Sequence, residues 1–307
     1  MIRLGFGLGL FFGSLMLGWW LHRRGRLSQQ HAARLARWVS MWPSALALGL
    51  LFWQLDLRSV QPWLLPALGL AISIATLLPA WWYLRHDRLS SAQTGSFFAC
   101  AFFSNVGYLG AVIAFAMYGE AGYGLCLLYY LLFSPCFYTF GFWLGMHYGG
   151  QKHETPQATT YRAELRWYPY AGMAAGILLN LVHIPRPIAC EWLNHLLIPL
   201  NNGLYLLAIG SQLTFESPRP YVRPCVAMAA IKFLYTPLLA WALVSAIHLS
   251  GLPRFVVLLE AAMPVAVSPF ILPLLFGVDR KLTNAVWLVT TALSLPWLLL
   301  YLPLIRL

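Results

Sequence analysis

The sequence predicts an all-α polytopic membrane protein with ten transmembrane helices. Three observations support this class. Hydrophobic residues make up 60% of the chain and charged residues 9%, which excludes a soluble domain of this length. The apolar residues gather into runs of about 20, the length of a helix that crosses a bilayer. The basic residues gather in alternate loops, which assigns those loops to the two sides of the membrane.

Ten apolar runs are long enough to be spans, and they lie at residues 4–21, 38–55, 63–84, 97–118, 123–147, 168–182, 193–213, 225–249, 255–276 and 282–305. The first run does not fit a cleavable signal peptide, because the heavier positive charge, Arg23, Arg24 and Arg26, follows it. We therefore expect a retained first span with its amino terminus outside. Ten spans then place both termini outside, in an inner (plasma) membrane.

The positions of arginine and lysine support this topology. With ten spans, most of the 20 basic residues lie on the inner side, as the positive-inside rule requires. An odd number of spans would spoil this bias in the second half of the chain. The inner set is Arg23, Arg24, Arg26, Arg34, Arg37, Arg85, Arg88, Lys152, Arg162, Arg166, Arg219, Arg223, Arg280 and Lys281.

Composition and motifs exclude several function classes. The net charge of +11 is spread through short loops beside apolar runs, so topology and anionic lipid headgroups explain it better than nucleic acid does. The cysteines have no CxxC spacing and the histidines are scattered, so we expect no metal site and no cofactor. The chain has no P-loop, no nucleophile elbow and no pair of intramembrane carboxylates, so we expect no enzymatic activity.

A polar segment at residues 148–166 divides the ten runs five and five. Five is odd, so two homologous halves would cross the membrane in opposite directions, which is the inverted-repeat pattern of many carriers. We predict a first five-helix repeat at 1–147, a cytoplasmic linker at 148–167 and a second repeat at 168–307.

Two spans carry signs of a broken helix. The ninth contains Pro264, two further prolines and the carboxylate of Glu260. Each interior proline removes a backbone hydrogen bond, and hydrocarbon offers no water to replace it. In the fourth span, Asn105, Gly107 and Gly110 interrupt an apolar run. If both helices break where they cross, their free N–H groups favour an anionic group; alternatively, the glycines only permit close packing and the amide bonds a neighbouring helix.

Two charged residues fall inside spans. Glu260 is the only acid clearly within one, and it must be shallow, paired or protonated. It is a candidate for proton coupling or a hydrated acid lining an outer vestibule. Lys232 either meets a substrate carboxylate or extends its amine toward the inner headgroups. Their depths differ by several Å, so a direct salt bridge requires tilt or unwinding. Asn201 is a candidate for the opposite side of a site, or for interhelical bonding.

The motifs resemble one family. The sequence AAMPVAVSPF of the ninth span, the charged loop Asp279-Arg280-Lys281 and LSLPWLLLY in the tenth look like the carboxy-terminal signature of the auxin efflux carrier family. N-x-x-x-x-G followed by AMYG in the fourth span looks like the other crossover of that family, and Lys232 with Pro237 is similar to its K-x-x-x-x-P pattern. The resemblance covers nearly the whole chain.

The resemblance implies two inverted repeats with crossovers at spans four and nine. It also implies a scaffold of spans one, two, six and seven, elevator-like transport of small organic anions by the remaining spans, and frequently a homodimer. One departure concerns Val112, which stands where the family usually has a proline. The expected substrate site comprises Asn105, Gly107, Gly110, Val112, Pro264, Val265, Ser268 and Asn201, with Glu260 and Lys232 nearby as charge.

We therefore expect a secondary transporter, or permease, of small organic anions such as carboxylates or auxin-like compounds, in contact with membrane lipids. The closest rival is a sodium-coupled bile-acid-type symporter, which needs oxygen ligands for the cation; only Glu260, Asn105, Ser268 and Ser294 are available. A non-transporting sensor or assembly subunit is the alternative from another class. It would usually carry an extra soluble domain.

Overall fold

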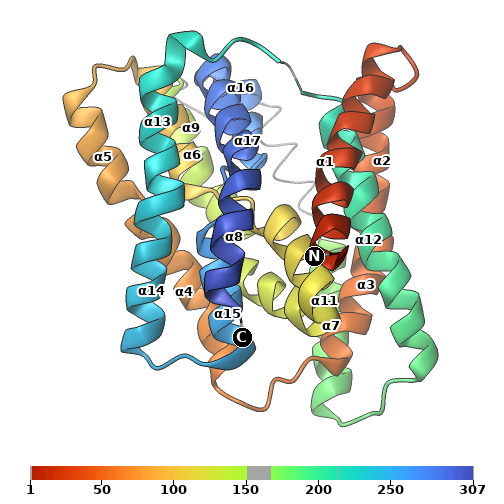
Figure 1. The fold of residues 1–307 in the computed structure, drawn as a ribbon. Helices are drawn as coiled ribbons and strands as arrows, with labels where there is room; N and C mark the ends of the chain where they lie inside the picture. Colours follow the sequence, from red (N-terminus) through yellow and green to blue (C-terminus); the bar gives the residue numbers. More distant parts are fainter. Residues whose placement is uncertain (1, 151–166, 214, 307) are drawn as a thin grey trace. The chain divides into compact units, whose positions relative to one another are not determined.

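A computed structural model describes residues 2–150, 167–213 and 215–306, and within these ranges the chain is helical without named strands (Figure 1). The predicted linker at 148–167 lies mostly outside the described residues. The helices form two compact units. Unit 1 contains Met1–Ser59, Gly107–Leu125 and Leu165–Leu213, and unit 2 contains Val60–Val106, Cys126–Glu164 and Thr214–Leu307.

Unit 1 contains all of the predicted first, second, sixth and seventh spans. They appear as α1 (Ile2–Arg23), α2 (Gln29–Met41) with α3 (Pro43–Gln54), α11 (Trp167–Leu181) and α12 (Ile188–Gly210). The second span is interrupted because Pro43 begins α3 and supplies no N–H. Part of α7 (Ala111–Tyr130) also belongs to unit 1.

Glycines bring the helices of unit 1 into close contact. A Cβ added to Gly18 of α1 would lie 2.0 Å from the Leu207 carbonyl oxygen of α12, and one added to Gly210 would lie 2.1 Å from the Leu15 oxygen. Between α11 and α3, a Cβ on Gly172 would lie 2.0 Å from the Ala45 oxygen. Small residues at such crossings let backbones approach, which is how helices commonly associate in lipid.

Unit 2 contains the predicted third, eighth, ninth and tenth spans, the first half of the fourth and most of the fifth. Its elements are α4 (Gln61–Ala75), α5 (Leu77–His86), α6 (Ser91–Phe102), α8 (Phe133–Cys136), η2 (Phe137–Gly141), α9 (Phe142–Tyr148), η3 (Arg219–Tyr221), α13 (Val222–Ala230), η4 (Ile231–Tyr235), α14 (Thr236–Ala246), α15 (Gly251–Ala261), η5 (Ser268–Phe270), α16 (Ile271–Phe276) and α17 (Arg280–Ile305).

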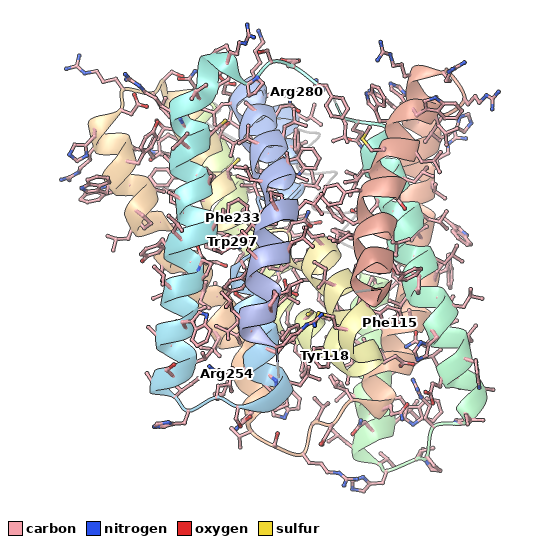
Figure 2. All side chains as sticks on the ribbon, viewed as in Figure 1. Phe115, Tyr118, Phe233, Arg254, Arg280 and Trp297 are labelled. Carbon is pink, nitrogen blue, oxygen red and sulfur yellow. The ribbon has the colours of Figure 1, made fainter. Side chains whose placement is uncertain are left out.

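Side chains fix the ends and the packing of these helices. Ser90 and Gln93 form a reciprocal capping box at the start of α6, and the Asp279 side chain accepts from the Leu282 N–H at the start of α17. The column α13–η4–α14 runs beside α17 (Figure 1). Figure 2 shows Phe233 next to Trp297 between these elements, with ring centroids 5.8 Å apart.

The structure supports a polytopic membrane protein. Five helical stretches within the described ranges are long and apolar enough to cross a bilayer: Gln29–Gln54, Gln61–His86, Val106–Tyr148, Arg219–Ala246 and Arg280–Ile305. The other predicted spans coincide with helices α1, α11 and α12 and with the interrupted pair α15 and α16. The ten-span, inverted-repeat topology remains a prediction.

Candidate functional site

Two interrupted helices meet inside unit 2. Helix α6 ends at Phe102 and α15 ends at Ala261, and the extended chain that follows each one pairs with the other. The Asn105 N–H donates to the Pro264 carbonyl at 2.8 Å, and the Ala266 N–H donates to the Phe103 carbonyl at 3.0 Å. Ser104 and Val265 thereby form an antiparallel bridge. We call residues 103–105 and 262–267 the crossover.

The pairing explains how unwound backbone persists in an apolar environment. A broken helix leaves N–H and C=O groups without partners, and these are costly where water is absent. Pro264 accounts for the break after α15, because it has no N–H and disfavours helical backbone at the preceding residue. The fourth span breaks without a proline, at residues 103–105 and therefore before Val112. That residue lies in the first turn of α7, one position after its start at Ala111.

Asn105 is the polar side chain of the crossover with unmet bonding capacity. Its side chain is 2% exposed, and neither its amide nitrogen nor its amide oxygen has a hydrogen-bond partner. Buried polar groups in folded proteins are nearly always bonded. An amide without partners beside a helix break therefore marks a place for a ligand or for bound water. In the other segment of the crossover, the Val265 N–H donates to the Thr290 hydroxyl of α17 at 3.4 Å.

Lys232 contacts the crossover directly. Its ammonium donates to the Ala101 carbonyl at 2.6 Å and to the Ser104 hydroxyl at 2.7 Å, and the residue is 0% exposed. The predicted alternative in which the amine extends toward the inner headgroups is therefore wrong in this structure. Lys232 belongs to η4, a π-helical turn, and such turns occur often at functional sites.

Glu260 lies in the last turn of α15 and is 1% exposed. The Cys126 thiol is near, but neither carboxyl oxygen has a hydrogen-bond partner of ordinary geometry. A hydrated acid lining an outer vestibule does not fit this burial. Lys232 and Glu260 form no salt bridge, since the ammonium is bonded to Ala101 and Ser104 instead.

Four other predicted site residues, Gly107, Gly110, Val112 and Asn201, lie in unit 1. Gly107 and Gly110 belong to η1 (Val106–Gly110), a second π-helical turn. Val112 is 2% exposed and lies beside α1, since a Cβ added to Gly7 would lie 3.6 Å from its Cγ1. Asn201 of α12 is 7% exposed, and its side-chain oxygen has no partner.

Comparison with known proteins gives the family. A family model described as membrane transport protein matches residues 11–302. The chain belongs to this family, that of the auxin efflux carriers. It is 24% identical over 287 residues to an uncharacterized transporter of Methanothermobacter thermautotrophicus, covering 92% of this chain and 91% of the other. It is also 24% identical over 216 residues to an uncharacterized transporter of Methanocaldococcus jannaschii, covering 68% and 67% of the two chains.

This membership makes the chain an integral membrane transporter and not an enzyme. Within unit 2 of the transporter, the structure brings Asn105, Pro264, Val265 and Lys232 into one bonded network. Ser268 begins the short helix η5 that follows the crossover. Glu260 precedes the crossover but has no bond to it.

Sequence reasoning missed one polar cluster of the transporter, in unit 1. Arg186 and Glu120 form an ion pair at 2.7 Å, and the Asn194 amide donates to the same carboxylate at 2.9 Å. A His195 ring nitrogen lies 4.0 Å from the other carboxylate oxygen. Glu120 follows Gly119, whose φ of 62° reverses the chain. The sequence shows only an acid in a short loop, and nothing in it couples that acid to an arginine 66 positions away.

Proposed function

We propose that this transporter is a secondary active permease of small organic anions such as carboxylates or auxin-like compounds. The crossover with the unpartnered amide of Asn105 is the observation that supports it most. An amide N–H donates well to a carboxylate, and hydrogen bonds to charged partners are stronger than neutral ones. The Lys232 ammonium bonds Ser104, the residue before Asn105, so positive charge lies against the same segment of the crossover. Both features favour an anion over a cation.

The proposed movement is of the elevator type. Such a mechanism requires one part of the chain to stay fixed and another to carry the substrate. Two observations support it: the chain divides into two compact units, and unit 1 contains the four spans that the family resemblance gives to the scaffold. Ten spans in two inverted repeats, both termini outside an inner membrane and a homodimer complete the proposal.

Transport by the purified protein tests this proposal. The full chain is reconstituted into liposomes, and a panel of mono- and dicarboxylates is screened for substrate-evoked current and for counterflow of labelled substrate. Each assay is run at several pH values, with and without sodium. We expect accumulation of at least one carboxylate, with competition between similar anions. No response to any anion would overturn the organic-anion proposal, and uptake that strictly requires sodium would favour a sodium-coupled symporter.

A further inference from the structure

The end of α6 is the kind of place where carriers commonly bind a coupling cation. At the carboxyl end of a half-helix, the last carbonyl groups lack intrahelical partners and carry partial negative charge. In transporters with broken helices, such ends and the unwound carbonyls beside them coordinate sodium or protons. In this chain, α6 ends at Phe102 inside unit 2, and Ser104 follows in the crossover.

A side chain already occupies this place. Lys232 donates to the Ala101 carbonyl and the Ser104 hydroxyl, both from the segment that ends α6. The Thr76 hydroxyl donates to the same Ala101 carbonyl at 2.8 Å. The two acceptors of Lys232, the Ala101 carbonyl and the Ser104 hydroxyl, are oxygen atoms, which are the ligands that hard cations prefer. The ammonium therefore bonds two oxygen atoms of the kind that also coordinate a small cation.

Among the residues that the structure describes, no acid forms an ion pair with Lys232. Glu260, the acid predicted to lie within a span, is buried, and neither of its carboxyl oxygens bonds Lys232. Without a carboxylate, the compensation for burying an ammonium comes from the helix end and from the oxygen atoms that it bonds. A neutral hydrogen-bond donor would satisfy the same two oxygens without that burial cost. Hydrogen bonding alone therefore does not explain why a charged side chain stands at this position.

We infer that Lys232 is a built-in cation that occupies the coupling-ion position at the carboxyl end of α6. Because the cation is covalently part of the chain, the crossover keeps its pairing with no external ion. The consequence is a carrier that requires no sodium for stability or for binding. This consequence for coupling rests on the proposed function, but the assignment of the position does not.

Thermal unfolding of the purified full chain tests the assignment without any substrate. Apparent unfolding temperatures are measured in sodium, lithium, potassium and choline chloride at equal ionic strength. For the wild type we expect the same temperature in all four salts. For Lys232→Ala we expect a fall of at least about 5 °C in choline that sodium or lithium partly restores. Lys281→Ala, which removes an exposed lysine at the start of α17, is the matched control and should show neither effect.

Two further variants separate charge from hydrogen bonding. Lys232→Arg keeps the charge and should remain independent of sodium, whereas Lys232→Gln keeps a donor without charge and should be less stable than the arginine variant. A wild type stabilised selectively by sodium would overturn the inference. So would a glutamine variant as stable as the wild type, or an alanine variant whose loss of stability no cation reverses. If the alanine variant does not fold, the wild-type salt series and the stability of the glutamine variant still test the assignment of Lys232 to the cation position.

The same variants also separate this inference from the proposed function. In liposomes, wild-type uptake should be unchanged when choline replaces sodium. Absence of uptake together with the expected unfolding results would reject the organic-anion proposal and leave the cation assignment standing.

Discussion

Arg186 binds Glu120 through two hydrogen bonds, from Nη1 to Oε2 at 2.7 Å and from Nη2 to Oε1 at 3.3 Å. The guanidinium also donates to the Leu50 carbonyl at 3.0 Å. The Arg186 side chain, from the loop that precedes α12, therefore connects α7 with α3. The Arg186 and Glu120 side chains are only 4% and 13% exposed. A bidentate pair with this burial is a fixed structural contact and differs from a surface ion pair.

Removing one partner of this pair should destabilise unit 1. For Glu120→Gln or Arg186→Met we expect a loss of about 3 kcal/mol, because each leaves a largely buried charge without its partner. The loss is measured as a lower apparent unfolding temperature of the purified protein. Arg58→Met, at an exposed arginine, is the control and should change little.

The double variant Glu120→Gln with Arg186→Met isolates the coupling between the two residues. We expect it to be less damaging than the sum of the single changes, because it leaves no unpaired charge. Strict additivity would show that the pair contributes no interaction of its own.

Close packing of α1 on α12 gives a second prediction. In Gly18→Leu, the added side chain would start 2.0 Å from the Leu207 carbonyl oxygen, so the two helices must separate or the variant must misfold. We expect poor yield of monodisperse protein in size-exclusion chromatography. Gly13→Leu on the same helix meets nothing within 4 Å and should behave like the wild type. Equal damage from both changes would point to a general effect of leucine in α1.

The sequence predicts the break in the ninth span for a physical reason, because Pro264 cannot continue a hydrogen-bonded helix. The break in the fourth span is less evident from sequence. It lies at residues 103–105, where the backbone bonds Pro264 and Ala266, and no local propensity encodes a partner about 160 residues away. Periodicity and composition locate helices, but they do not specify which residues meet.

The charged residues show the same limit. Lys232 is recognisable as a buried cation from its position in an apolar run, yet its bonds to Ala101 and Ser104 follow from packing. Glu120 lies in what the sequence presents as a loop between two spans, and the positive φ of Gly119 turns it toward Arg186. Long-range pairs of this kind require the tertiary structure.

The amide of Asn105 gives a third prediction, which concerns substrate affinity. If the amide donates to a carboxylate substrate, Asn105→Ala removes a hydrogen bond to a charged group, worth about 1.5 to 3 kcal/mol. We therefore expect KM for the transported anion to rise about tenfold or more, with the unfolding temperature little changed, since the amide bonds nothing in the structure.

Asn284→Ala is the matched control for that measurement. Asn284 is likewise buried, at 1% exposed, with both amide atoms unpartnered, but it lies on α17, outside the crossover. If KM rises in Asn284→Ala but not in Asn105→Ala, the substrate site lies at α17 and not at the crossover.

Glu260 gives the last prediction, which concerns the driving ion. A charged carboxylate near the centre of a bilayer costs about 2.5 to 3.5 kcal/mol, and no hydrogen bond of ordinary geometry reaches the oxygens of this one to offset the cost. The buried carboxyl should therefore carry a proton in this conformation and release it only where water reaches the group. A proton that travels with the moving unit would couple transport to the proton gradient. In Glu260→Gln, which is permanently neutral, we expect uptake to lose its dependence on pH while exchange of substrate persists. Glu191→Gln, at an exposed position of α12, should keep the pH profile of the wild type, and an unchanged profile in Glu260→Gln would exclude the coupling role.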